Sequence, residues 1–111
     1  NARQLASRFI DDVRTGKRIW TFHTVPKKGE FGYDTWEKNS AEDNGNTGVW
    51  TQVSVDEELG LAYLAVESAT SDFFGGHRPG NNLFANSLVA VDLKTGERRW
   101  HVAGSLLVAV A

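Results

Sequence analysis

The stretch DVRTGKRIW at residues 12–20 returns as DLKTGERRW at residues 92–100. Both copies place Thr-Gly between two segments of strand-like character, and both end in tryptophan. Gly16 and Gly96 can adopt the positive φ that a tight hairpin requires, and Asp or Thr side chains can accept hydrogen bonds from the turn amides. Each copy therefore predicts a β-hairpin.

The segments around these hairpins favour strands over helices. Apolar residues alternate in RIWTFH at 18–23, TQVSV at 51–55 and SLVAVDL at 87–93, and GLAYLAV at 60–66 is a short apolar run. Residues 24–49 show no sustained period and predict a long loop excursion. The two copies begin 80 residues apart, at residues 12 and 92. Without the loop, this spacing approaches the roughly 40 to 50 residues of a propeller blade.

We therefore predict an all-β fold built from antiparallel, four-stranded propeller-blade repeats, with about one and a half blades of a β-propeller in the chain. Residues 1–23 would form the last hairpin of a preceding blade, and residues 24–49 the loop excursion. Residues 50–104 would form one complete blade, whose strands lie at increasing distance from the propeller axis, and residues 105–111 are an unassigned tail. Trp20 and Trp100 would pack neighbouring blades together and contact no ligand.

Composition excludes several classes of protein. The chain has 111 residues, 41% of them hydrophobic, and a formal charge of -2, which is typical of an ordinary globular domain. Its 12 basic and 14 acidic residues provide no basic field for nucleic acid, and no apolar run is long enough to span a membrane. Cysteine is absent, which excludes disulfides and thiolate metal sites. Methionine is absent even at residue 1, and no signal peptide is evident, so we expect an internal segment of a longer protein.

Four further motifs accompany the repeats: GEFGYDTWE at 29–37, NTGVW at 46–50, VDEELGLAYL at 55–64 and DFFGGHRPGNNLFANSLVAVD at 72–92. Together they resemble the pyrroloquinoline-quinone (PQQ)-dependent alcohol and glucose dehydrogenases. That family forms an eight-bladed β-propeller with the quinone and a calcium ion near the axis. The resemblance implies a periplasmic segment of a quinoprotein dehydrogenase that oxidises alcohols or sugars, with the remaining propeller blades supplied by a longer chain.

Two residues carry the expected site. Trp50 follows the NTG turn and begins a candidate innermost strand, and the resemblance implies that its ring forms the floor on which PQQ stacks. An ordinary core tryptophan is the alternative. Ser68 stands where the resemblance implies a calcium-binding asparagine, and a serine hydroxyl is a less common ligand of Ca²⁺. Glu67 is adjacent and ionisable, but strand alternation should point it to the opposite side, so we do not expect it to replace the ligand.

The expected catalytic base is missing. The resemblance implies a catalytic aspartate in the segment after Trp100, but no Asp or Glu follows Glu97 in this sequence. We therefore predict no catalytic residue and no dehydrogenase activity for this segment alone. A non-catalytic propeller scaffold or interaction module, and a truncated product, remain open alternatives.

The remaining candidates have simpler explanations. Trp36 and the carboxylates of GEFGYDTWE either border the cofactor or belong to a solvated loop. The three histidines His23, His77 and His101 lack zinc-binding spacing, so we expect isolated surface or rim residues.

Overall fold

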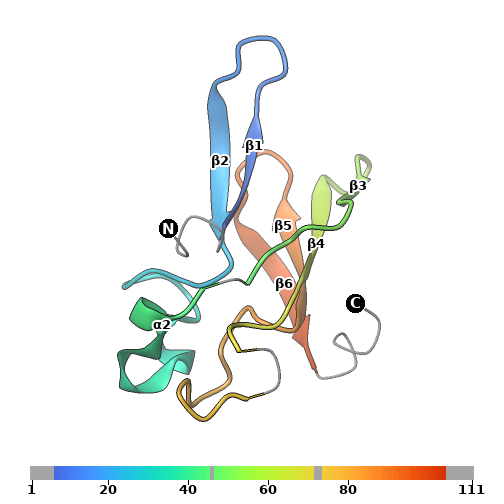
Figure 1. Ribbon diagram of the computed structural model, residues 1–111. Coiled ribbons are helices and arrows are strands. Elements are labelled where there is room, and N and C mark those ends of the chain that lie inside the picture. Colours follow the sequence, from blue (N-terminus) through green and yellow to red (C-terminus); the bar gives the residue numbers. More distant parts are fainter. Residues whose placement is uncertain (1–6, 46, 72–73, 105–111) are drawn as a thin grey trace.

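The computed structural model describes residues 7–45, 47–71 and 74–104, which form two antiparallel sheets (Figure 1). The first sheet pairs β1 (Ser7–Asp11) with β2 (Arg18–His23). The second has four strands in sequence order: β3 (Ser54–Asp56), β4 (Leu61–Val66), β5 (Ser87–Asp92) and β6 (Arg98–Ala103). The predicted all-β fold class and the up-and-down order of a propeller blade are confirmed. The unassigned tail at 105–111 lies outside the described residues.

The central strands of the four-stranded sheet are apolar on both faces. On one face Leu64 lies opposite Val89, and on the other Tyr63 lies opposite Ala90. Facing residues in antiparallel strands share one side of the sheet, so the register fixes which side chains meet. A sheet with two apolar faces requires a covering layer on each side.

The two Thr-Gly turns have the same geometry. Asp12 Oδ1 accepts the amides of the second and third residues after it at 2.8 and 3.1 Å, and Asp92 Oδ1 does so at 2.9 and 3.0 Å. Gly16 and Gly96 have φ of 72° and 73°. At the second turn the amide bonds from Lys94 and then Thr95 lower the pKa of Asp92. The predicted hairpins are confirmed, and local contacts fix both of them.

Trp20 joins the two sheets. Its side chain is 6% exposed, and its Nε1 donates a hydrogen bond to the carbonyl of Leu93 at 2.9 Å, in the turn of the second hairpin. Its ring lies so close to Gly96 that a Cβ there would be 2.5 Å from ring atoms. The main core lies between the hairpin and the sheet and contains Trp20, Phe22, Val49, Ala62, Leu64, Val66, Phe84, Val89 and Val91. The first hairpin therefore covers one face of the sheet, as the predicted packing of blades requires.

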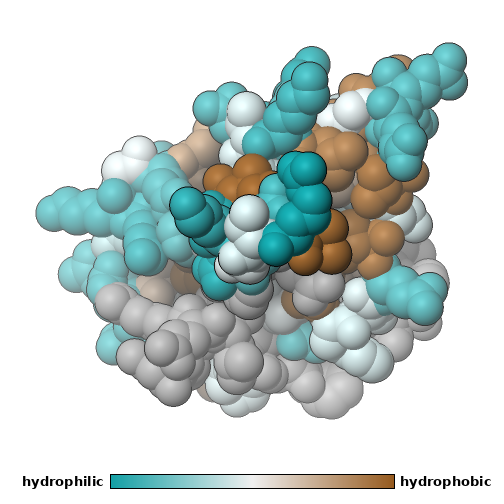
Figure 2. All heavy atoms as spheres, turned by 90° about the horizontal axis from the view of Figure 1, so that it is seen from above, coloured by the Kyte–Doolittle hydropathy of each residue, from teal (hydrophilic) through white to brown (hydrophobic). Residues whose placement is uncertain are grey.

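The other face of the sheet is less well covered. Trp100, the counterpart of Trp20, is 40% exposed, and its neighbour Val102 is 60% exposed. The Trp100 ring contacts Tyr63 with a centroid distance of 5.9 Å. At the end of the molecule that carries the short turns, hydrophobic surface lies between hydrophilic side chains (Figure 2). The packing role of Trp100 stays a prediction.

The long connections gather at one end of the sheets and the short turns at the other (Figure 1). Residues 24–53 join β2 to β3, and residues 67–86 join β4 to β5. The first connection contains the 3₁₀ helices η1 (Tyr33–Thr35) and η2 (Glu37–Asn39) and the α-helix α2 (Ser40–Asp43). Each helix is too short to produce a helical period in the sequence. The sequence therefore predicted a loop over residues 24–49 and did not predict these helices. None of the helices within the described ranges has the length and apolarity needed to cross a membrane.

The two long connections pack against each other around Trp36. This side chain is 3% exposed, and its Nε1 donates a hydrogen bond to the carbonyl of Leu83 at 2.6 Å. Its partners in this second core are Val25, Ala41, Ala69 and Ala85. Trp36 is thus a core residue that joins the loops, and we call the packed unit of residues 24–45, 67–71 and 74–86 the loop lobe.

The histidines are not isolated, contrary to the sequence-based expectation. His23 Nδ1 lies 3.1 Å from a carboxylate oxygen of Glu30, and His77 Nε2 lies 2.8 Å from the Thr70 carbonyl in the loop lobe. His101 packs against Phe84, with a centroid distance of 5.3 Å. Each histidine contacts a residue at least seven positions away in sequence, and hydrophobic periodicity does not predict such contacts.

The stability of the fold is expected to fall in mild acid because of His101. Burial, and then the positive charge of Arg98, lower the pKa of His101 below its ordinary value of 6.5. The unfolded chain therefore takes up the proton first, and stability falls as the pH decreases through 6.5 toward the lower folded value. Urea unfolding of the natural chain and of His101→Phe between neutral and mildly acidic pH measures this effect. His23 and His77 are common to both chains, so parallel pH profiles would contradict the assignment.

Candidate functional site

Trp50 lies in the connection between β2 and β3, two residues after Gly48, which pairs with Glu67 beyond the end of β4. It precedes β3, and its side chain is 70% exposed, whereas the preceding Val49 is 5% exposed and belongs to the main core. The indole therefore projects from a backbone that is anchored one residue earlier. Within the described residues Trp50 belongs to neither hydrophobic core.

The sequence predicted that Trp50 begins the innermost strand, but the structure does not place it there. That strand, β3, starts only at Ser54, which lies opposite Tyr63. An unbroken ladder would bring residue 50 opposite Glu67, but it is Gly48 whose carbonyl accepts the amide of Glu67 at 3.1 Å. The chain therefore accommodates two additional residues before β3 begins. This irregular segment interrupts the ladder and contains the exposed Trp50.

Ser68 follows the end of β4 and is 9% exposed. The hydrogen bonds around it connect its segment to the segment that leads to Trp50. Besides the Gly48–Glu67 bond, both the amide and the hydroxyl of Thr70 donate to the Gly45 carbonyl, at 3.3 and 3.2 Å. The structure thus brings the backbones on either side of Trp50 and Ser68 together at one end of the blade.

Glu67 is the residue that the sequence-based reasoning set aside. Its carboxylate Oε1 accepts the amide of Gly48 at 3.0 Å, so it points toward the segment that leads to Trp50. Glu67 lies directly beyond Val66, the last residue of β4. Gly48 was the available signal, because a glycine in a loop often permits a close approach by another group.

The residues present fit a planar ring better than a calcium ion. An exposed indole at a fixed position offers a stacking surface for a planar group. Calcium requires six to eight oxygen ligands, and within the described part of the chain no three His, Cys, Asp or Glu side chains converge on a metal position. Ser68 alone cannot provide such a site, so a calcium ion would take most of its ligands from other residues.

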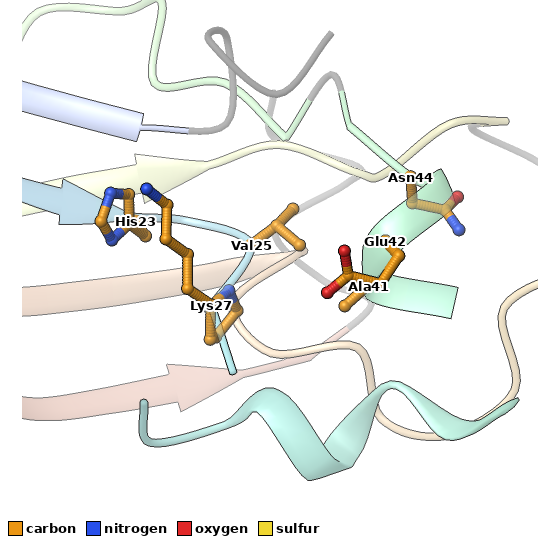
Figure 3. A pocket seen from close by; sticks show the side chains of 7 residues that line it. His23, Val25, Lys27, Ala41, Glu42 and Asn44 are labelled. Atoms are coloured by element: carbon orange, nitrogen blue, oxygen red, sulfur yellow. The ribbon is translucent and has the colours of Figure 1, made fainter. Parts of the chain in front are cut away.

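Two cavities lie away from this surface. The first has a volume of about 180 Å³ and lies between the end of β2 and α2. Its lining includes His23 and Lys27 on one side, Ala41, Glu42 and Asn44 on the other, and Val25 between them (Figure 3). The second, of about 450 Å³, lies between the two hairpins and is lined by Phe22, Phe31, Phe84, Gly96 and Arg98, among others. Neither is lined by Trp50 or Ser68.

Comparison with known proteins agrees with this architecture. The family model described as glucose/ethanol/alcohol dehydrogenase, beta-propeller domain (PQQ), matches residues 11–103. The quinohemoprotein alcohol dehydrogenase ADH-IIG of Pseudomonas putida is 34% identical over 81% of this chain and 14% of its own length. The dehydrogenase subunit of the alcohol dehydrogenase (quinone) of Gluconobacter oxydans is 33% identical over 90% of this chain and 15% of its own length.

Solved structures give the same result. The structure of ADH-IIG from Pseudomonas putida HK5 superimposes with a TM-score of 0.77 and 33% identity, over 87% of this chain and 16% of that enzyme. The quinohemoprotein alcohol dehydrogenase of Comamonas testosteroni gives a TM-score of 0.74 and 25% identity over the same shares. The chain spans about one seventh of the length of these relatives. It therefore belongs to the PQQ-dependent glucose/ethanol/alcohol dehydrogenase family and corresponds to a segment of the β-propeller domain.

Proposed function

We propose that this chain supplies one wall of the quinone site in a PQQ-dependent dehydrogenase that oxidises alcohols or sugars. Trp50 is the residue that binds the cofactor, and its exposed ring stacks on the planar quinone. The supporting observation is that Trp50 is 70% exposed while the adjacent Val49 is 5% exposed, which presents an indole face from an anchored backbone.

When bound, the quinone supplies the two-electron oxidation of the hydroxyl group. The part of this chain is to hold the ring in position and to exclude water from one of its faces. Stacking of a planar ring on an aromatic side chain tolerates many substituents, so Trp50 contributes affinity more than substrate selection. The hydroxyl of Ser68 lies at the same end of the blade and would be a minor ligand if a calcium ion is present.

The segment is proposed to be inactive by itself. It spans about one seventh of the relatives it matches, and no three acidic or metal-binding side chains of its described residues converge. The remaining blades of a longer chain are therefore the proposed partner, and the less covered sheet face around Trp100 is where the next blade would pack. We propose a periplasmic location, as for quinoprotein dehydrogenases in general.

A non-catalytic propeller scaffold is the second candidate function. It is favoured by Ser68, a poor replacement for an amide ligand, and by the lack of a converging metal-binding group among the described residues. The exposed Trp50 argues against it, because neither core of the described residues uses that side chain.

Titration with PQQ distinguishes these functions. The natural chain is expected to bind PQQ with quenching of tryptophan fluorescence, and Trp50→Ala to weaken binding about tenfold or more, since one stacked ring contributes about 1–3 kcal/mol. Trp50→Phe should retain part of the affinity. Trp100→Ala removes another exposed tryptophan and is the matched control, with unchanged affinity. Equal titrations of the natural chain and Trp50→Ala would contradict the proposed role.

A further inference from the structure

Residue 67 is where three segments of the chain meet. The amide of Glu67 donates to the Gly48 carbonyl at 3.1 Å, and its own carbonyl accepts the amide of Asn86 at 3.1 Å. Its carboxylate Oε1 accepts the amide of Gly48 at 3.0 Å. In a regular antiparallel pair the two backbones would exchange both bonds. Here the side chain of Glu67 provides the second bond, so one residue holds both polar groups of Gly48.

Gly48 is adapted to this contact. A Cβ at this position would lie 2.9 Å from Oε1 of Glu67, closer than real Cβ contacts permit. With a side chain at this position the flexible carboxylate of Glu67 would have to shift from its place at the amide. The pair joins the end of β4 to the irregular segment that precedes β3, where regular strand pairing is interrupted.

Trp50 depends on this pair for its orientation. Its ring is 70% exposed, so packing restrains the side chain only weakly, and its direction follows from the backbone at residues 48 and 49. Val49 fixes one point of that backbone in the main core. The hydrogen bonds between Glu67 and Gly48 fix a second point of the backbone, two residues before Trp50.

We infer that Glu67 is a positioning residue for Trp50, acting through the amide of Gly48. The value of this role for catalysis rests on the proposed function of Trp50, whereas the positioning itself is a property of this chain. A carboxylate suits the task because a hydrogen bond to a charged acceptor is stronger than one between neutral groups. The amide oxygen of glutamine can accept the same bond, so Glu67→Gln should preserve most of the effect, and Glu67→Ala should abolish it.

Fluorine NMR of the chain labelled with 5-fluorotryptophan tests the positioning directly. The Trp50 resonance is assigned by its absence in Trp50→Phe, and the resonances of Trp20 and Trp36 report whether the two cores remain folded. In Glu67→Ala we expect the Trp50 resonance to shift or broaden while those of Trp20 and Trp36 stay in place; in Glu67→Gln all should stay near their natural positions. An unchanged Trp50 resonance in Glu67→Ala, or equal shifts of all the tryptophans, would overturn the inference.

Titration with PQQ adds the functional consequence. If Trp50 binds the quinone, Glu67→Ala should weaken binding by up to about tenfold, as expected for loss of one hydrogen bond to a charged group, and Glu67→Gln should restore most of it. Equal affinities of Glu67→Ala and the natural chain would contradict the inference while leaving the role of Trp50 intact. If the natural chain and Trp50→Ala respond equally to PQQ, the proposed function fails, and the NMR result alone decides the positioning role.

Discussion

Replacing Gly96 by alanine is expected to destabilise the chain by about 3 to 5 kcal/mol, because the new methyl group adds steric overlap to backbone strain. Gly96 has φ of 73°, and its Cβ would lie 2.5 Å from the ring of Trp20. The ring cannot simply move away, because its Nε1 is bonded to the Leu93 carbonyl and its surface lies in the main core. Urea unfolding of the 111-residue chain measures the loss.

Gly16 is the matched control within the same molecule. Its φ of 72° reproduces the backbone of Gly96, but nothing lies within 4 Å of the position that a Cβ would occupy. Gly16→Ala should therefore cost only the strain of the left-handed conformation, about 1 to 2 kcal/mol. In a Trp20→Ala background the additional cost of Gly96→Ala should disappear, because residues in contact do not act additively. Equal costs for the two glycines in the natural chain would show that Trp20 does not press on the second turn.

The comparison of the two hairpins also explains what the sequence could predict. Each hairpin is specified within nine residues, because the aspartate and threonine side chains accept amides of the same turn and the glycine adopts a positive φ, so both turns were predictable from local chemistry. The different surroundings of Trp20 and Trp100 were not predictable, because the two occupy equivalent positions in the sequence and differ only in what lies next to them in space.

The bounds of β3 were not predictable from the sequence for a related reason. The alternation in TQVSV predicted a strand over residues 51–55, but only Ser54–Asp56 pair with β4. The preceding backbone bond joins Gly48 to Glu67, just beyond β4, and the chain between Gly48 and Ser54 is two residues longer than a regular ladder would require. The alternation in TQVSV does not predict this contact, which depends on Gly48 and the carboxylate of Glu67, 19 residues apart in sequence.

The candidate site was predicted unevenly. Trp50 and Ser68 were identified through the resemblance to quinoprotein dehydrogenases, and the structure brings their segments together at the loop end of the blade. Glu67 was considered from the sequence only as a replacement calcium ligand, and its hydrogen bond with the Gly48 amide was not predictable because the two residues lie 19 positions apart. Resemblance locates positions that a family uses, whereas the contacts that orient those positions in this chain require coordinates.

The loop lobe is expected to lose its structure when Trp36 is replaced by alanine, with a cost of about 3 to 5 kcal/mol for truncating a large buried aromatic side chain. Trp36 is 3% exposed and lies at the centre of the second core, where it joins the two long connections. Trp36→Phe retains most of the apolar contact but leaves the Leu83 carbonyl without its indole donor, for a smaller cost of about 1 to 3 kcal/mol. Urea unfolding of both variants measures these costs.

The location of the damage from Trp36→Ala is the sharper test. The sheet rests on the main core, which shares no buried residue with the core around Trp36, so β4 and β5 should keep their protection from hydrogen exchange. The amides of Glu37 and Asn82, which bond to the Pro79 and Thr35 carbonyls, should exchange much faster. Because Ser68 belongs to the lobe and Glu67 of the lobe bonds to Gly48 near Trp50, PQQ binding should weaken as well, although neither Trp50 nor Ser68 belongs to the core around Trp36. A uniform loss of protection across β4, β5 and the lobe would instead mean that the two cores unfold as one unit, and that the loop end of the blade cannot change independently of the sheet that carries it.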